Sequence, residues 1–215
     1  MITSSFAAVQ DSAGKPAGYV YSEKDWNPIT VAQATENPSL GYRASKTFAE
    51  RAAWEFVERE KPGFDVVTMN PPLVFGPVVH SLKSLGQLNT SNELIRDLMQ
   101  GKYKSEVLPQ ARVFFWVDVR DLAEAHVKAV DVKEAGGKRF FVTAGDYSNE
   151  EVARAVGKGF PELKGVVPTD FREAGYGGGR PGYDNKRSVE MLGIRYRSLR
   201  ECVVDTVKSL KGIPQ

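Results

Sequence analysis

The sequence predicts an α/β fold that contains a doubly wound parallel sheet, and three observations support this expectation. A long helical pattern begins at Gly41 and stops at residues 61–63, where Lys-Pro-Gly is a strong stop signal. Short β-rich runs lie on either side of this helix, at residues 1–5 and 64–69. Beyond them, strands and helices keep alternating. A strand, a helix and a second strand in this order form a unit whose two strands must be parallel.

The remaining elements follow from hydrophobic periodicity and from helix start and stop signals. Residues 10–40 read as a loop because glycine and proline recur through them, and Trp26 is the expected anchor of that loop. Asp118 or Asp121 is expected to cap the helix that follows the third strand. The expected strands are 1–5, 64–69, 114–117 and 139–143, and the expected helices are 41–61, 89–99, 118–130, 149–158 and 198–210.

The composition is that of an ordinary globular protein, and its charge balance argues against nucleic acid and membrane surfaces as partners. The chain has 215 residues, of which 41% are hydrophobic and 26% are charged, and its 29 basic and 27 acidic residues are interspersed. Because this balance predicts no basic face, neither nucleic acid nor a membrane surface is an expected partner. No apolar run approaches the length of about 18 residues that a transmembrane helix needs.

Cysteine and histidine usage argues against a disulfide framework and against a metal site. Cys202 is the single cysteine, which fits a reducing compartment and makes the cytoplasm the expected location. Its place in a helical pattern predicts a buried, unreactive thiol. His80 and His126 have no cluster of ligating residues near them, so both are expected to be structural and no metal is expected.

The long helix carries the first candidate for catalytic chemistry. From their spacing, its apolar stripe is predicted to consist of Ala49, Ala52, Ala53, Phe56 and Val57. Tyr42 and Lys46 fall on that same core-facing stripe, one turn apart. Burying a lysine is costly unless it is paired or employed, and an ammonium one turn from a phenol stabilises the phenolate. The pair therefore predicts a tyrosine that protonates a carbonyl oxygen.

Two serines and a proline-rich segment are expected at the ligand-binding edge of the sheet. In open parallel sheets, ligands lie beyond the carboxyl ends of the strands. Ser4 and Ser5 lie at the end of the first strand, and residues 71–74 follow the second. A serine hydroxyl in this position can hydrogen-bond a substrate carbonyl beside Tyr42. The alternative for a Ser-Ser pair is an ordinary polar strand end, and the spacing alone does not decide between the two.

The glycine-rich segment near the C-terminal end does not predict a dinucleotide site. Gly177, Gly179 and Gly182 satisfy the letters G-x-G-x-x-G. However, no strand precedes them, Pro181 interrupts them, and no helix opens at the last glycine, so the structural context of such a site is missing. A surface or substrate-side loop is expected instead.

Several motifs together resemble the extended short-chain dehydrogenase/reductases, and within them the dihydroflavonol-reductase-like and fungal methylglyoxal or ketone reductases. The resemblance covers nearly the whole chain in collinear order, which makes it far more specific than the Tyr-Lys pair alone. The motifs are T-S-S-F-A-A-V at 3–9, W-N-P at 26–28, Y-x-x-x-K at 42–46, F-A-E at 48–50, N-P-P-L-V-F-G-P at 70–77, N-T-S at 89–91, D-V-R-D-L-A-x-A-H at 118–126 and Y-D-N at 183–185.

The resemblance implies roles for individual residues. Ser5 would orient the substrate carbonyl, with Ser4 as the alternative serine. Tyr42 would be the proton donor, and Lys46 would tune Tyr42 and hold the nicotinamide ribose. The cofactor-contacting residues implied by the resemblance are Tyr42, Lys46, Pro71, Pro72, Leu73, Val74 and Ser91.

The resemblance also leaves part of the family without a counterpart. The family's first half, with its glycine-rich phosphate turn and the residues that select NADP or NAD, is absent from the sequence. The implied fold is therefore a partial doubly wound (Rossmann-like) parallel sheet, C-terminal strands only, with a mixed α/β substrate-binding lobe. Residues 1–77 are assigned to the sheet and 78–215 to the lobe, with 113–143 expected to return to the sheet.

The implied function is reduction of a ketone or aldehyde by NAD(P)H, with NADP(H) favoured over NAD(H), in a truncated form of the enzyme. The expected partner is a small carbonyl substrate, and the expected state is a monomer or weak oligomer. A sugar-nucleotide epimerase or dehydratase of the same superfamily is an alternative, ranked lower because Y-D-N at 183–185 resembles the reductases. A non-catalytic fragment or interaction module that keeps the site letters is the other alternative.

Overall fold

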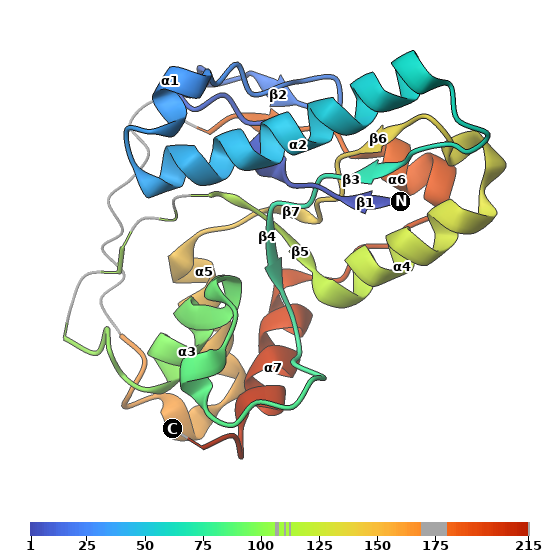
Figure 1. Ribbon diagram of the computed structural model, residues 1–215. Helices are drawn as coiled ribbons and strands as arrows, with labels where there is room; N and C mark the ends of the chain where they lie inside the picture. The colour runs from blue at the N-terminus through green and yellow to red at the C-terminus, as the bar shows by residue number, and fades with distance from the viewer. Residues whose placement is uncertain (106–107, 110, 112, 169–179, 215) are drawn as a thin grey trace. The chain divides into compact units, whose positions relative to one another are not determined.

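The structure is a computed structural model that describes residues 1–105, 108–109, 111, 113–168 and 180–214 (Figure 1). The chain forms two compact units, which are described separately. Unit 1 comprises Met1–Pro72, Asp121–Thr143 and Tyr176–Arg195, and unit 2 comprises Leu73–Arg120, Ala144–Gly175 and Tyr196–Gln215. The division at residue 77 and the return of residues 113–143 to the sheet stay predictions.

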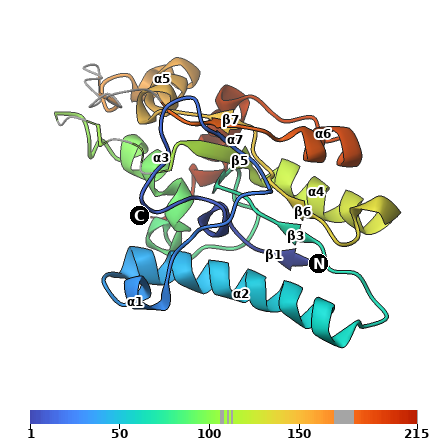
Figure 2. The same ribbon diagram turned by 90° about the horizontal axis from the view of Figure 1, so that it is seen from above.

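A parallel sheet forms the centre of unit 1. Strands β1 (Ile2–Thr3), β3 (Thr68–Met69) and β6 (Arg139–Phe140) lie in the order β1-β3-β6. Ile2 pairs with Thr68, and Thr68 pairs with Arg139, both in parallel register. Both views show these strands between helix α2 (Pro38–Glu60) on one side and α4 (Val119–Asp131) on the other (Figures 1 and 2). The predicted parallel strand-helix-strand unit is confirmed, with shorter strands.

Helix α2 begins three residues earlier than the pattern predicted. Asn37 is its N-cap and accepts a hydrogen bond from the Leu40 N–H at 3.0 Å, and Pro38 occupies the first turn. Proline suits that turn because the missing N–H would have no helical partner there. The predicted end is confirmed, because Lys61 closes the helix in the left-handed region, at φ 45°.

The predicted buried face of α2 is wrong. Its fully buried residues are Ala44, Thr47 and Glu50, whereas residues 49, 52 and 56 of the predicted stripe are exposed. The helix packs against the short 3-10 helix η1 (Phe6–Ala8) and against α1 (Val31–Ala34). Periodicity placed the apolar side chains inward, but a carboxylate with enough hydrogen-bond donors can occupy the buried position instead.

Residues 10–40 contain more regular structure than the expected loop. Strand β2 (Val20–Tyr21) pairs in parallel with β8 (Gly182–Tyr183), and Thr30 forms a capping box with Gln33 at the start of α1. The pairing of β2 has no local signature, because its partner lies far away in the sequence. The segment is also tied to the core, where the Tyr21 ring meets the Phe6 ring edge-on at 5.3 Å between centroids.

The rest of unit 1 completes its core. Phe6 stacks on Phe141 with ring centroids 5.0 Å apart. Helix α6 (Lys186–Leu192), which the sequence did not predict, ends at Gly193 in the left-handed conformation. Among the described residues, the short 3-10 helices are η1, η2 (Leu85–Gln87), η3 (Thr90–Asn92), η4 (Lys133–Ala135) and η5 (Pro161–Leu163).

Unit 2 has its own sheet, in the order β4-β5-β7. Strand β4 (Leu73–Phe75) pairs in parallel with β5 (Phe115–Asp118), and β5 pairs antiparallel with β7 (Gly145–Asp146). The sequence predicted β5 but gave residues 71–74 only as a strand end, because Asn-Pro-Pro is a stop signal. Strand β4 begins directly after the second proline, and it belongs to a different sheet from β3.

Three predicted helices are confirmed in unit 2. They are α3 (Glu93–Met99), α5 (Asn149–Gly159) and α7 (Leu199–Leu210). Ser148 caps α5 in a capping box with Glu151, and Ser198 caps α7. Their apolar faces form one core with the sheet, whose largest fully buried members include Phe75, Ile95, Leu98 and Leu210.

The molecule therefore has the predicted α/β character, with parallel strand pairs and intervening helices. No helix among the described residues is long and apolar enough to cross a bilayer. Of the glycine-rich segment, Gly177 and Gly179 lie outside the described residues, whereas Gly182 belongs to β8.

Candidate active site

The two serines at the end of β1 have different surroundings. Ser4 is buried, at 6% exposure, and its hydroxyl donates to Glu50 Oε2 on α2. Ser5 is partly exposed and caps η1, where its Oγ accepts a hydrogen bond from the Ala7 N–H at 3.1 Å. Successive side chains of an extended chain point to opposite sides, so only one of the two hydroxyls can enter the buried cluster. Ser5 keeps its hydroxyl hydrogen for another acceptor.

Tyr42 and Lys46 lie near the N-terminal end of α2, one turn apart. The Tyr42 side chain is 54% exposed, and Lys46 is partly exposed. Within the part of the chain that the structure describes, neither the Tyr42 hydroxyl nor the Lys46 ammonium has a hydrogen-bond or ion-pair partner. The predicted burial of this pair against the core is wrong, because α2 turns Thr47 and Glu50 inward.

Glu50 is the best-connected side chain of unit 1, and the sequence reasoning gave it no role. It is 1% exposed. Its Oε1 accepts from Arg139 Nε at 2.6 Å and from Thr68 Oγ1 at 2.9 Å. Its Oε2 accepts from Asn70 Nδ2 at 2.6 Å and from the Ser4 hydroxyl. These four donors come from β1, β3 and β6 or from the residues that directly follow them, and a fifth, Trp54 Nε1 on α2 itself, lies 3.4 Å from Oε1.

The Glu50 carboxylate stays charged although it is buried. Burial raises the pKa of a carboxyl group, but the hydrogen bond and charge of Arg139, with the hydrogen bonds from Ser4 and Asn70, outweigh burial. The pKa of Glu50 therefore lies below its ordinary value. A buried carboxylate with this many donors is held in one position by its hydrogen bonds.

Arg139 extends the Glu50 contacts to the loop after β2. Its Nη1 donates to the carbonyl oxygens of Glu23 at 2.7 Å and Asp25 at 2.6 Å. Its guanidinium lies 3.7 Å from the centre of the Trp26 ring. Trp26 is thus the predicted anchor of its loop, held by a cation-π contact. Among the described residues, Arg139 Nη2 is a buried nitrogen without a hydrogen-bond partner.

The segment after β3 connects the same cluster to Ser5. Asn70 Nδ2 donates to the Ser5 carbonyl oxygen at 3.2 Å as well as to Glu50. The Phe6 N–H donates to the Pro71 carbonyl oxygen at 2.8 Å. Pro71 is buried and Pro72 is half-buried. Unit 1 thus brings the Ser5 strand end and residues 70–71 into direct hydrogen-bond contact.

Unit 2 contains the other residues of the predicted cofactor contact. Leu73 and Ser91 line a cavity of about 430 Å³, together with Phe75, Tyr103 and Tyr147. Val74 lines a separate cavity of about 150 Å³ beside Asn92. Asn92 Nδ2 donates to the Gly76 carbonyl oxygen at 3.1 Å and so ties η3 to the end of β4.

Gly76 is required where β4 meets α4. Its φ is 138°, and a Cβ atom at this position would lie 2.6 Å from Val119 Cγ1. Any side chain would therefore push the start of α4 away from β4. The glycine of the Gly76-Pro77 pair that follows β4 is therefore required for close packing against Val119.

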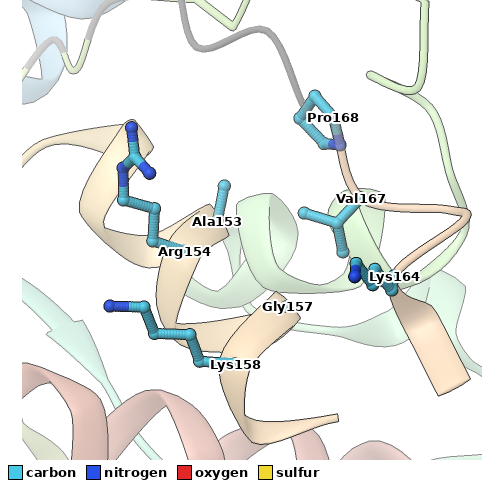
Figure 3. A pocket seen from close by; sticks show the side chains of 7 residues that line it. All are labelled: Ala153, Arg154, Gly157, Lys158, Lys164, Val167 and Pro168. Atoms are coloured by element: carbon cyan, nitrogen blue, oxygen red, sulfur yellow. The ribbon is translucent and has the colours of Figure 1, made fainter. Parts of the chain in front are cut away.

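A third cavity lies on the face of α5 and contains none of the predicted site residues. It measures about 270 Å³, and Ala153, Gly157, Val167 and Pro168 form its apolar walls. Arg154, Lys158 and Lys164 border it (Figure 3). Arg154 is paired with Glu150 at 2.7 Å.

His126 and Cys202 both make contacts within the fold. His126 Nε2 lies 2.8 Å from Thr3 Oγ1, and its Nδ1 lies 2.8 Å from the Leu122 carbonyl oxygen. Cys202 is fully buried, and burial together with the charge of Asp118 raises its pKa. Within the described ranges, no group of His, Cys, Asp and Glu side chains could hold a metal ion.

Comparison with known proteins identifies the family. Residues 17–144 match the NAD dependent epimerase/dehydratase family, which is more than half of the chain. The chain belongs to this family. The ketoreductase azaE of Aspergillus niger is 45% identical over 98% of the chain, and the NADPH-dependent methylglyoxal reductase GRE2 of Saccharomyces cerevisiae is 35% identical over 98%.

Solved structures of epimerase/dehydratase family members confirm the fold. The crystal structure of Gre2 in complex with NADPH from Candida albicans matches 97% of the chain with a TM-score of 0.86 and 35% identity. This chain spans about three fifths of the length of these relatives: 61% of the Aspergillus protein, 62% of the Saccharomyces protein and 62% of the Candida structure.

Sequence reasoning missed Glu50, Asn70 and Arg139 as parts of the site. A signal for Glu50 was present, because it lies one turn after Lys46 and two turns after Tyr42 on the same helix. A charged residue at one-turn spacing from a candidate catalytic pair indicates a possible buried polar contact, in addition to the apolar stripe. Arg139 had no comparable local signal, since its partner carboxylate lies 89 residues away.

Proposed function

We propose that this chain carries the catalytic residues of an NADPH-dependent carbonyl reductase that acts on a small ketone or aldehyde. The observation that carries the proposal is the Tyr42–Lys46 pair, which is at least partly exposed and has no side-chain partner among the described residues. The pair lies on the same helix as Glu50, whose carboxylate is held by several donors. A phenol and an ammonium that have no protein partner, on a helix held in place by a buried carboxylate, are suited to act on a ligand.

Each residue has a distinct role in the proposed reaction. When bound, NADPH supplies the hydride. Tyr42 donates its proton to the oxygen of the substrate as negative charge develops there, and Lys46 stabilises the resulting phenolate. Ser5 donates a hydrogen bond to the same oxygen. Ser5 is preferred over Ser4 because the Ser4 hydroxyl is committed to Glu50 in the interior.

NADP(H) is the proposed cofactor in preference to NAD(H), because the methylglyoxal reductase GRE2 is named as NADPH-dependent and the Candida Gre2 structure is an NADPH complex. The proposed contacts with the nicotinamide end of such a molecule follow from the family resemblance. Lys46 would hold the ribose, and Pro71, Pro72, Leu73, Val74 and Ser91 would line the nicotinamide side.

We propose further that the phosphate-binding turn lies outside these 215 residues and that unit 1 holds the C-terminal strands of a larger doubly wound sheet. A pyrophosphate needs a glycine turn leading from a strand into a helix N-terminus. The described residues offer no such turn, since β1 leads into the three-residue η1. Strand β1 is also the edge of its described sheet, and Ile2 is exposed there.

A hybrid enzyme tests the catalytic assignment. It joins this chain to the segment of the Aspergillus ketoreductase that lies outside the matched region. In this hybrid, Tyr42→Phe should lower kcat by about 10² to 10⁴, the range expected for loss of one general acid. Tyr196→Phe, which lies in unit 2 outside the proposed site, is the matched control and should leave kcat unchanged. A Tyr42→Phe hybrid with wild-type turnover would refute the assignment.

The substrate panel separates the reductase from the epimerase or dehydratase alternative. Simple ketones and aldehydes should be reduced with oxidation of NADPH, whereas nucleotide sugars should not be converted.

The 215-residue chain alone tests the position of the phosphate turn, because it should show no saturable NADPH binding by calorimetry. Tight binding by the chain alone would contradict that part, and an inactive hybrid would favour a non-catalytic module.

The proposal includes the setting in which the enzyme works. The single cysteine is free and buried, which supports the cytoplasm as the location. A monomer or weak oligomer is proposed. Analytical ultracentrifugation of the hybrid at several concentrations tests the oligomeric state.

A further inference from the structure

One carboxylate joins the helix of the proposed catalytic pair to the ends of three strands. Glu50 lies on α2, and its donors Ser4, Thr68, Asn70 and Arg139 lie at or directly after β1, β3 and β6. We call these five residues the Glu50 cluster. Its members are each at most 8% exposed. A buried hydrogen-bonded network of this kind fixes one arrangement of the elements that it connects.

The cluster fixes α2 close to the proposed catalytic pair. Lys46 and Tyr42 lie one and two turns before Glu50 on the same helix. A helix is stiff over two turns, so a carboxylate held by four donors sets both the rotation and the height of that end of α2. The exposed ends of Tyr42 and Lys46 have no protein partner of their own among the described residues, so they depend on the helix for their placement.

The same cluster fixes the proposed carbonyl-binding serine. Ser4 is adjacent to Ser5, and Asn70 bridges Glu50 and the Ser5 carbonyl oxygen. The backbone of Ser5 is thereby held on both sides, while its Oγ receives the Ala7 N–H. The Glu50 carboxylate is therefore the shared support of Ser5, Tyr42 and Lys46.

We propose that Glu50 is a positioning residue for the reaction, which sets the geometry of Tyr42 and Lys46 relative to Ser5 without touching substrate. This inference rests on the proposed function. It goes beyond a role in stability, because a buried ion pair can often be replaced by apolar residues of similar volume without loss of stability. Catalysis tolerates less, since a misplacement of about 1 Å can lower the rate about 10²-fold.

The charge-removing double variant Glu50→Met/Arg139→Met separates positioning from stability. It removes both charges together, so no uncompensated charge stays buried, although Ser4, Thr68 and Asn70 lose their acceptor. The unfolding midpoint should therefore fall by less than that of Glu50→Ala, which leaves Arg139 uncompensated. In the hybrid enzyme, its kcat should fall about 10²-fold, while the KM for the carbonyl substrate stays within about twofold of wild type. Glu55→Gln, an exposed glutamate on the same helix, should change neither quantity.

A milder variant covers the case in which the double variant does not fold. Thr68→Val removes one donor to Glu50 and keeps the size of the side chain and the Arg139 ion pair. It should lower kcat by about threefold to tenfold, in line with partial loosening of the network. A folded Glu50 double variant, or a folded Thr68→Val hybrid, with wild-type kcat would overturn the inference.

A readout on the 215-residue chain itself needs no catalysis. The Ala7 amide donates to Ser5 Oγ, so its hydrogen exchange reports whether Ser5 keeps its conformation. Exchange at Ala7 should accelerate in Glu50→Met/Arg139→Met and stay unchanged in Glu55→Gln. If Tyr42→Phe keeps full activity in the hybrid, the proposed function fails. If Tyr42→Phe is inactive and either Glu50-cluster variant is folded and fully active, only the positioning role fails.

Discussion

Unit 1 buries the carboxylate of Glu50 on helix α2, unit 2 buries that of Asp118 at the end of β5, and these two carboxylates find their partners in opposite ways. Besides Trp54 on its own helix, Glu50 in unit 1 takes its donors from residues 18 to 89 positions away. Asp118 in unit 2 is fully buried, and its main partner is Arg120, two residues later. The Arg120 N–H, Nε and Nη2 bind Asp118 at 2.8, 2.9 and 2.7 Å.

The difference separates a local cap from a tertiary network. Asp118 starts α4, and its hydrogen bonds form as soon as the first turn of that helix forms. Apart from the local contact with Trp54, the hydrogen bonds of Glu50 exist only when three strands and α2 have assembled. In both cases burial raises the carboxyl pKa and the arginine outweighs it, so both pKa values lie below their ordinary values. The electrostatic result is the same, although the folding requirement differs.

The largest expected effect is the loss of Glu50 alone. Glu50→Ala leaves Arg139 buried without its counter-charge, and breaking one side of a buried pair costs about 3–5 kcal/mol. Urea unfolding of the 215-residue chain, followed by the fluorescence of Trp26 and the other tryptophans, measures this loss. Glu55→Ala on the exposed side of α2 is the control and should stay within about 0.5 kcal/mol of wild type. Equal effects of the two variants would mean that the Glu50 cluster contributes nothing to stability.

Loss of Asp118 is expected to have a smaller effect. Asp118→Ala removes a helix cap and a buried acceptor, but Arg120 keeps its ion pair with Asp205 at 2.8 Å and is partly exposed. A destabilisation of about 2 kcal/mol is expected from loss of a cap and of charge-assisted hydrogen bonds. The same unfolding experiment measures it. An effect as large as that of Glu50→Ala would contradict the distinction between local and long-range partners.

Acid should weaken the Glu50 cluster. The folded pKa of Glu50 is below its ordinary value of 4.5, so the carboxylate contributes stability above that value and loses the contribution as pH falls through the lower, folded pKa. The stability difference between wild type and Glu50→Gln should therefore shrink as pH falls from about 5 to about 3. Urea midpoints measured across that range check this sign. A difference that grows on acidification would show that Glu50 is not held as a carboxylate.

The sequence predicted the parts of the fold that depend on near neighbours. The cap at Asp118 was expected from short-range rules, and the helices that Ser148 and Ser198 cap were expected at 149–158 and 198–210. The start of α2 was less well placed, because Asn37-Pro38 was read with the preceding loop although it is a regular helix start.

The parts that were not predicted depend on distant partners. Tyr42 and Lys46 were identified from their spacing, but their exposure was not, because periodicity cannot show that a glutamate will be the buried residue of the next turn. Glu50 can be buried only because Arg139 arrives from β6. Strand β2 likewise exists through its pairing with β8, more than 160 residues later. Such contacts belong to the assembled sheet and leave little trace in local sequence.

The smallest expected effects come from matched helix caps, and they test whether the two units differ in anything besides the range of their contacts. Thr30 caps α1 in unit 1 and Ser148 caps α5 in unit 2, each in a capping box. Thr30→Ala and Ser148→Ala should each cost about 1 kcal/mol in urea unfolding, because each removes one local acceptor of a helix N–H. Similar values would show that local contacts have equal strength in both units, so that the gap between Glu50→Ala and Asp118→Ala arises from the long-range partners. A much larger loss for Ser148→Ala would instead mean that unit 2 is the less stable unit, and that the comparison between the two carboxylates must be corrected for it.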